Sequence, residues 1–173
     1  MKKLLIVLGV IILSGCVDIR YENSIIINAP KNIVFEILED YENYPNIIPE
    51  FHANVRIITE NNTGMGVQFI NNSTFGGYKM ESIFEVIEYR FNEYIKLENK
   101  SQYGFTELFV DEIENDVTLY KLINNLRVPK SMENKLFTAY NNELEIIKRL
   151  SEYIFQQIKQ YLLRLTNGNR SPP

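Results

Sequence analysis

The sequence predicts one α+β domain in which a curved antiparallel sheet of about seven strands packs on a long C-terminal helix. Two patterns carry this prediction. Between residues 52 and 125, apolar and polar side chains alternate, as they do in strands with one buried face. From residue 131 to about residue 164, the chain has neither Gly nor Pro and carries apolar residues at helical spacing. The length of 173 residues suits a single domain.

The segment before the alternating region predicts one strand and two short helices. Residues 24–28 form a β-branched run, and Pro30 ends it in a position that suits the first turn of a helix. Helical spacing then predicts a helix to about residue 40, with the apolar residues Ile33, Val34, Ile37 and Leu38. The Tyr-Pro pair at 44–45 and the Ile-Pro pair at 48–49 frame a second short helix, because a residue before proline disfavours the helical conformation.

The alternating region predicts a meander of antiparallel strands. The expected strands are about 52–60, 65–73, 77–88, 92–100, 103–112 and 116–125. Short connections rich in Asn, Asp, Ser and Gly join them, at residues 61–64, 76–77, 99–101 and 115–116. Links this short make neighbouring strands antiparallel, and the apolar face of such a meander needs a cover.

Alternation also assigns side chains to the inner face of the sheet. In the 77–88 strand these are Tyr78, Met80, Ser82, Phe84 and Val86, and in the next strand they are Ile95 and Leu97. In the last strand we favour Tyr120 and Leu122 over the alternate set. The stretch 105–110 does not alternate clearly and receives no assignment.

The C-terminal segment predicts the cover of the sheet. Ser131 is a candidate N-cap, and Glu133 follows in the first turn. One apolar stripe runs along the helix through Leu136, Tyr140, Ile147, Leu150, Ile154, Ile158 and Tyr161. Charged residues, including Glu143, are assigned away from it. The folded domain is therefore expected over 22–164, and residues 165–173 are expected to be a disordered tail.

The N-terminus has the organisation of an export signal. Lys2 and Lys3 precede the apolar run 4–13, which is too short to span a bilayer. Leu13-Ser14-Gly15-Cys16 then resembles the lipobox of prokaryotic lipoproteins. The resemblance implies a signal peptide over 1–15, lipidation of Cys16, a linker over 16–21, and an extracytoplasmic domain anchored to the membrane of the cell envelope. The alternative is an uncleaved hydrophobic anchor.

Composition argues against several classes of function. A formal net charge of −4 without a basic stripe disfavours nucleic-acid binding. His52 is the only histidine and Cys16 the only cysteine, so the sequence predicts no metal site, no disulfide and no cofactor. It contains no motif for a catalytic residue. His52 is interpreted as a partly exposed residue at a strand start; the alternative is a general base beside Glu50.

The order of these elements resembles the START-like superfamily. That group includes polyketide cyclases/aromatases, the birch pollen allergen group and coenzyme-Q-binding proteins. The matching residues are Ile27-Asn28-Ala29-Pro30, Val34-Phe35, Leu38, the run 40–45, Ile48-Pro49 and Gly64-Met65-Gly66. The resemblance covers about residues 22–161 and implies the helix-grip fold. The sequence departs from the typical member in having no Trp in the sheet and in carrying an export signal.

The resemblance implies an apolar cavity between the helix and the sheet, and thus a carrier or binder of a hydrophobic small molecule such as a lipid or isoprenoid. The candidate ligand-binding residues are Tyr78, Met80, Phe84, Leu97, Tyr120, Leu122, Tyr140, Ile147 and Leu150. The same side chains are also suited to filling a solid core. Two other functions stay open: a cyclase/aromatase-type enzyme that positions its substrate with Tyr78, Tyr120 or His52, and an envelope interaction module without a cavity.

Overall fold

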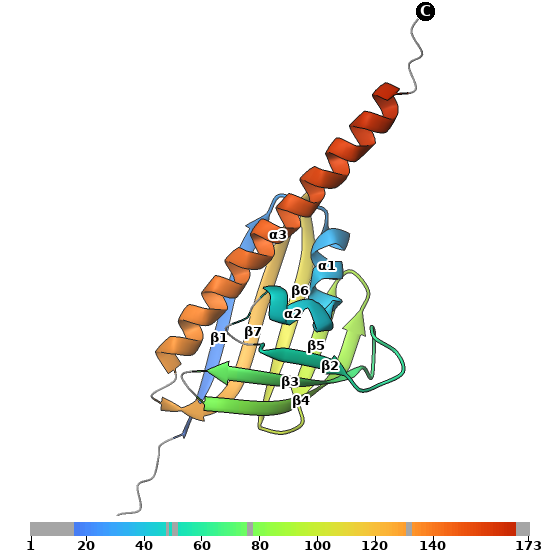
Figure 1. The fold of residues 1–173 in the computed structure, drawn as a ribbon. Coiled ribbons are helices and arrows are strands. Elements are labelled where there is room, and N and C mark those ends of the chain that lie inside the picture. The colour runs from blue at the N-terminus through green and yellow to red at the C-terminus, as the bar shows by residue number, and fades with distance from the viewer. Residues whose placement is uncertain (1–15, 48, 50–51, 76–77, 131–132, 169–173) are drawn as a thin grey trace, which may run out of the picture.

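The computed structural model describes residues 16–47, 49, 52–75, 78–130 and 133–168. A seven-stranded antiparallel sheet curves around one long helix, and short helices lie between the first two strands (Figure 1). This is the predicted helix-grip fold. The elements are β1 (Cys16–Ile27), α1 (Lys31–Glu39), η1 (Tyr41–Asn43), α2 (Tyr44–Ile47), β2 (Asn54–Ile57), β3 (Gln68–Phe75), β4 (Tyr78–Arg90), β5 (Tyr94–Asn99), β6 (Gly104–Glu114), β7 (Val117–Pro129) and α3 (Glu133–Gly168).

The sheet has the strand order β1-β7-β6-β5-β4-β3-β2. Strands β2 to β7 are neighbours in chain order, as the short connections predict. The first strand, β1, lies at the edge beside the last strand, β7. The register shifts between Val86 and Glu88 and again between Glu112 and Glu114. Irregularities of this kind bend a strand and increase its twist, which suits the curvature of the sheet.

Strand β1 begins earlier than the sequence predicts. It pairs with β7 over its whole length, from Cys16 opposite Pro129 to Ile27 opposite Thr118. Residues 16–21, expected to be a linker, therefore form half of an edge strand. The prediction started the strand at residue 24, where the β-branched run begins, whereas the preceding residues include the exposed charged side chains of Asp18, Arg20 and Glu22, which edge strands commonly carry. Residues 1–15, which include the expected signal peptide, lie outside the described residues.

Helix α3 covers the concave face of the sheet with one side only. Its buried residues are Leu136, Ala139, Tyr140, Leu144, Ile147 and Ser151. Its later turns extend past the end of the sheet (Figure 1). The helix continues to Gly168, four residues past the expected end, so residues 165–168 belong to it. The predicted roles of Ser131, Ile158 and Tyr161 stay predictions, because their side chains lie outside the described residues. No helix in the described ranges is long and apolar enough to cross a bilayer.

Helix α1 fills the other part of the concave face. Val34 and Phe35 are fully buried, and the Phe35 ring makes edge contacts with Tyr89 and Phe91 at centroid distances of 5.7 and 5.8 Å. α1 contacts β6, β7 and α3. This end of the domain is a packed core, and the candidate site lies at the other end.

Candidate functional site

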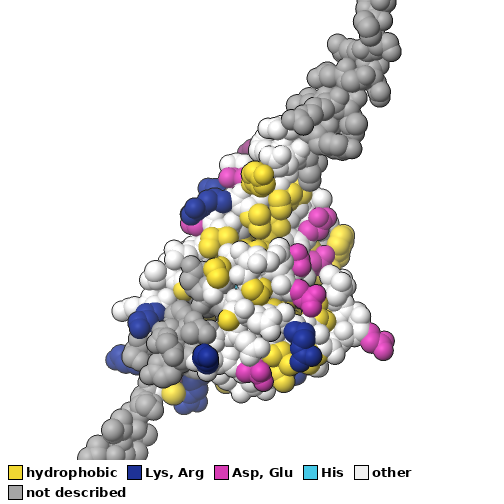
Figure 2. Space-filling view, in the orientation of Figure 1, with side chains coloured by type: hydrophobic (Ala, Val, Ile, Leu, Met, Phe, Trp, Pro, Cys, Tyr) yellow, Lys and Arg dark blue, Asp and Glu magenta, His cyan; other side chains and the backbone are white. Residues whose placement is uncertain are grey.

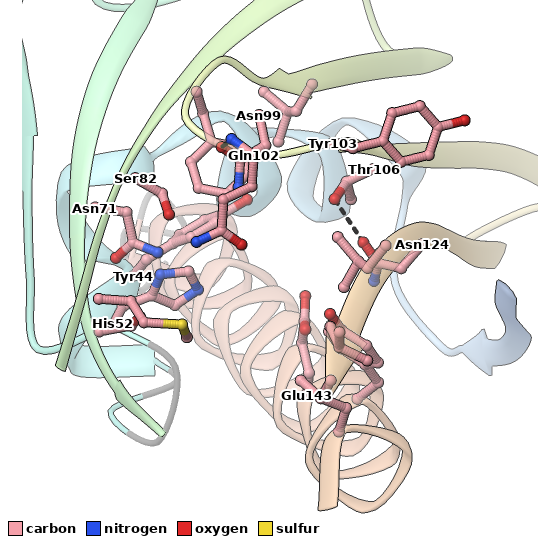
Figure 3. Close-up of a pocket in the computed structure, with 18 of the residues that line it drawn as sticks. Tyr44, His52, Asn71, Ser82, Asn99, Gln102, Tyr103, Thr106, Asn124 and Glu143 are labelled. Atoms are coloured by element: carbon pink, nitrogen blue, oxygen red, sulfur yellow. Dashed lines mark hydrogen bonds between the residues drawn. The ribbon is translucent and has the colours of Figure 1, made fainter. Parts of the chain in front are cut away.

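A cavity of about 180 Å³ lies between the sheet and the first turns of α3. Strands β3 to β7 form its floor, α3 forms its roof, and Tyr44 and His52 close one side (Figure 3). The apolar part of the wall consists of Phe69, Met80, Phe84, Leu97, Leu108 and Leu136. Exposed residues at the rim, including Gln102, Tyr103 and Arg127, mark the opening to solvent.

Uncharged polar side chains from five strands face the cavity, and five of them lie on its floor. These residues, which we call the polar band, are Asn71, Ser82, Asn99, Thr106 and Asn124. Asn71 and Ser82 are direct cross-strand partners, and so are Thr106 and Asn124. The Thr106 hydroxyl donates a hydrogen bond to Asn124 Oδ1 (Figure 3). The expected uniformly apolar cavity is thus corrected to an amphipathic one.

An aromatic series joins the core to the cavity wall. The Tyr41 ring stacks on Phe69 with centroids 4.7 Å apart, and Phe69 stacks on Phe84 at 5.4 Å. Phe69 and Phe84 both line the cavity. Parallel rings of this kind present flat apolar surface, which suits contact with planar or chain-like apolar groups.

Glu143 projects from α3 into the cavity (Figure 3). Separation from bulk water raises the pKa of its carboxyl group to about 8, because burial disfavours the charged form. No ion pair or hydrogen bond to this carboxyl group occurs among the described residues. The cavity therefore contains an acidic group that is mostly protonated near neutral pH when no ligand is bound.

His52 is partly exposed just before β2, as predicted, and its side chain also lines the cavity. Its ring lies 5.1 Å from the Tyr44 ring, measured between centroids. Burial lowers its pKa to about 4, and contact with the Asn71 side chain acts weakly in the opposite direction. His52 is therefore neutral at pH 7. The neighbouring residues Glu50 and Phe51 lie outside the described ranges, so the proposed pairing with Glu50 stays a prediction.

Four buried tyrosines lie within electrostatic reach of Glu143 and stay neutral, and two of them, Tyr44 and Tyr140, line the cavity. Burial is the main cause that raises the pKa of each tyrosine, and the nearby Glu143 carboxyl group raises it further. The four tyrosines are Tyr21, Tyr44, Tyr120 and Tyr140. The Tyr44 hydroxyl donates to the Leu38 carbonyl at 2.6 Å. The Tyr120 hydroxyl is buried and has no hydrogen-bond partner in the described part of the chain.

The structure separates the nine candidate ligand-binding residues into three groups. Met80, Phe84, Leu97 and Tyr140 line the cavity. Tyr120, Leu122, Ile147 and Leu150 instead belong to the packed core, because their strand and helix positions lie nearer the end that α1 covers. The Tyr78 side chain lies outside the described residues. Alternation assigned the correct face in all three strands where it was used, β4, β5 and β7. It did not distinguish a side chain that faces the cavity from one that packs against another layer.

Sequence reasoning missed Glu143 and four of the five residues of the polar band as cavity-lining residues. The residues at 71, 99 and 124 have the same parity as buried apolar neighbours in their strands, so alternation was a usable signal for them, whereas Thr106 lies in the stretch without clear alternation. Residues 71–73 are all polar, which conceals the inward position of Asn71. Glu143 follows Tyr140 by three and precedes Ile147 by four, the spacing of one helix face. Its charge concealed that signal.

Solved structures with this fold come from several kinds of protein. A START superfamily protein from Mycobacterium smegmatis has a TM-score of 0.61 and 18% identity, covering 80% of this chain and 98% of that one. The ZhuI aromatase/cyclase from a Streptomyces species has a TM-score of 0.65 and 15% identity, covering 79% and 94%. Norcoclaurine synthase from Thalictrum has a TM-score of 0.59 and 13% identity, covering 79% and 96%. No protein-family model and no curated protein matches the chain. The likeness establishes the fold.

Proposed function

We propose that this protein binds a small, mainly apolar molecule in the cavity between α3 and the sheet. The observation that carries the proposal is the cavity volume of about 180 Å³. An engineered cavity of about 150 Å³ in another protein admits benzene. A ring-sized or short-chain group therefore fits without displacement of the backbone. A lipid or isoprenoid-like molecule would enter with one end.

The distribution of side chains on the cavity wall supports an amphipathic ligand. Phe69 and Phe84 offer stacked apolar rings at one side, whereas the polar band crosses the floor. Sites for small molecules commonly combine apolar walls with a few polar groups that fix orientation. The apolar body of the ligand would contact the rings, and its polar end would meet the band or Glu143.

We further propose that Cys16 is lipidated and keeps the cavity close to a membrane. Cys16 is exposed and pairs with Pro129, and the adjacent pair Val17–Val128 reaches a residue that lines the cavity. Paired residues on antiparallel strands lie about 5 Å apart. A lipid on Cys16 would thus sit beside the cavity opening, and a ligand would pass from the bilayer with little exposure to water.

The charge at this end of the molecule fits the same orientation. Figure 2 shows basic side chains gathered where the chain enters β1. Arg127, at the rim, donates its backbone N–H to the Tyr103 carbonyl, and Tyr103 is 70% exposed. Basic and aromatic side chains are the types that favour the interface of an anionic membrane.

The binding proposal is tested by native mass spectrometry and solvent extraction of the full-length protein. We expect a co-purified small molecule in the parent and in Ser24→Leu, an exposed control on β1. Ser82→Leu places extra carbon atoms in the cavity, so we expect it to lose the ligand. A parent protein that yields no bound molecule, and whose mass does not shift on adding lipids, rejects the proposal.

The anchor proposal is tested separately by membrane fractionation of cells that express the full-length chain. Replacement of Cys16 by Ser removes the only thiol that a diacylglyceryl group can modify. We expect the parent to fractionate with membranes and Cys16→Ser to be released from them. Retention of the variant in the membrane fraction contradicts lipidation as the anchor.

A second candidate function is an enzyme of cyclase/aromatase type. The convergence of the polar band and Glu143 on one cavity favours it, because such groups are able to orient a reactive chain. Incubation with a linear poly-β-ketone tests this candidate. Cyclisation faster than in buffer, and slowed by Asn124→Leu, supports an enzyme. Equal rates with and without the protein reject it.

A further inference from the structure

Glu143 is the only acidic residue among the described residues that line the cavity, and its surroundings indicate the charge of the ligand. We propose that the bound molecule carries a cationic amine head that pairs with Glu143, while its apolar body contacts the aromatic wall. This inference rests on the proposed function and adds the chemical class of the ligand.

The position of Glu143 is one where an apolar residue would pack better. Tyr140, Glu143 and Ile147 share the inner face of α3, because their spacing of three and four matches the helical repeat. A leucine there would fill part of the cavity and bury more apolar surface. The chain instead carries a carboxyl group, whose burial destabilises the fold unless a partner offsets it. A cationic ligand is such a partner.

No cationic side chain in the described part of the chain pairs with Glu143. Among the described residues, seven ion pairs occur at exposed or half-exposed positions, and none includes this carboxyl group. Arg127 also lines the cavity, but its side chain is 61% exposed at the rim and lies 3.9 Å from Asp18. His52 is neutral at pH 7 because burial lowers its pKa to about 4.

Two tyrosine rings, those of Tyr44 and Tyr140, line the same cavity as the carboxyl group. The electrostatic influence of Glu143 extends to four tyrosines on four different elements: Tyr21 on β1, Tyr44 on α2, Tyr120 on β7 and Tyr140 on α3. The rings of Tyr21 and Tyr140 lie 5.0 Å apart between centroids. The face of a tyrosine ring attracts cations, and this attraction is stronger away from water.

The same set of groups disfavours an anionic ligand. A carboxylate or phosphate head inside the cavity would meet Glu143 and no buried cation, and it would lose its hydration without compensation. A neutral head, such as a hydroxyl or carbonyl group, would bond to the polar band or to protonated Glu143. The choice between an amine and a neutral head is therefore the one that an experiment must make.

Three probes with one apolar body and different heads make this choice: phenylbutylamine, phenylbutanol and phenylbutyrate. Their affinities for the full-length protein are measured by calorimetry at neutral pH. We expect the amine to bind at least about tenfold tighter than the alcohol, because it adds an ion pair to the same apolar contacts. We expect the carboxylate to bind most weakly.

Two variants assign the preference to one carboxyl group. Glu143→Gln keeps the size of the side chain and removes its charge, so we expect the amine and the alcohol to bind with similar affinity. Glu145→Gln, on the exposed side of the same helix, should keep the preference. Binding of the alcohol to Glu143→Gln shows that the variant is folded.

A proton count gives a second readout that a purely structural role of Glu143 would not produce. Pairing with a cation requires an ionised carboxylate, whereas the empty cavity favours the protonated acid, whose pKa is about 8. The neighbouring tyrosines keep their protons, and His52 is already neutral. Amine binding near pH 7 should therefore release close to one proton, measured in buffers of different ionisation enthalpy.

Each other outcome is decisive. Equal affinity for the amine and the alcohol overturns the amine inference and leaves the binding function standing, as does a preference that Glu143→Gln retains. Tightest binding of the carboxylate overturns it as well. Failure of all three probes to bind rejects the inference together with the proposed function.

Discussion

Two rows of cross-strand partners on the same two strands differ in what covers them. Val110 pairs with Tyr120, and four residues along each strand Thr106 pairs with Asn124. Both rows point to the concave face. The first row is apolar and almost completely buried, at 1% and 0% exposure. The second row is polar and lies on the floor of the cavity.

The difference shows how this fold makes a cavity without interrupting its sheet. α1 contacts β6 and β7 and fills the space above the first row. No second helix of that kind covers Thr106 and Asn124 in the described part of the chain, so only α3 spans that space. The sheet is continuous, but side chains of α1 pack on one part of its concave face, whereas the cavity lies over the other part.

Truncation of one phenylalanine in each region gives the largest expected contrast. Phe35 is fully buried, so Phe35→Ala should lower the free energy of unfolding by about 3–5 kcal/mol. Phe84 faces the cavity, and Phe84→Ala removes fewer contacts, so we expect a loss of about 1–2 kcal/mol. Urea unfolding of both full-length variants measures this. Equal losses would mean that the cavity is filled in solution.

The pH dependence of stability tests the acidic side of the cavity. The folded pKa of Glu143 is about 8, against an ordinary value of 4.5. The folded state therefore keeps a proton that the unfolded state has lost, and stability falls as pH rises through this window. Glu143→Gln removes the penalty and should be about 3–4 kcal/mol more stable than the parent at pH values above about 8. Near pH 4 the two proteins should be alike. A constant difference across the range would contradict this assignment.

His52 should produce the opposite dependence at low pH. Its folded pKa is about 4, against 6.5 for an ordinary histidine. The unfolded chain gains a proton first as pH falls, so stability is lost between these two values. We compare the free energy of unfolding of His52→Gln with that of the parent at two pH values. Between pH 7.5 and pH 4, this difference should shift in favour of the variant by about 2–3 kcal/mol. Guanidinium unfolding at both pH values checks this, and an unchanged difference would place His52 in water.

Filling the void gives the smallest expected change in stability. Ser82 is 7% exposed and faces the cavity. Ser82→Leu adds apolar surface where there is space, and we expect a gain of about 1 kcal/mol in the free energy of unfolding. Thermal unfolding measures it. A loss of more than about 1 kcal/mol would indicate overpacking, and thus a smaller cavity than described.

The fold follows from the sequence because periodicity reports directly on backbone conformation. The strand expected at 77–88 is β4 (Tyr78–Arg90), and the helix expected from residue 131 is α3 (Glu133–Gly168). Strand pairing followed from short turns such as 115–116, where Asp116 has a φ of 58°. A period of two or 3.6 assigns each residue to a face, and this is enough to place the layers.

The candidate site was less predictable, because alternation shows which face of the sheet a side chain is on but not how far away the opposite layer lies. Leu122 and Leu97 alternate in the same way, yet only Leu97 reaches the cavity. The difference depends on how far the opposite layer lies, which is set by α1 and the curvature of the sheet. Polar residues added a second obstacle. Glu143 was assigned to solvent because charge usually marks the surface, and the cavity is the exception.

The overhang of α3 has a consequence for local stability. Ser151 is the last fully buried residue among the described side chains of the helix, and its hydroxyl donates a hydrogen bond to the Ile147 carbonyl at 2.8 Å. Beyond it Ile154 and Phe155 are only partly buried against the core, so the later turns depend increasingly on the intrinsic preference of their residues. Amide hydrogen exchange should therefore be slow up to residue 151 and become faster with each turn over 152–160. The exchange rates along this helix would thus show where packing against the rest of the domain ends.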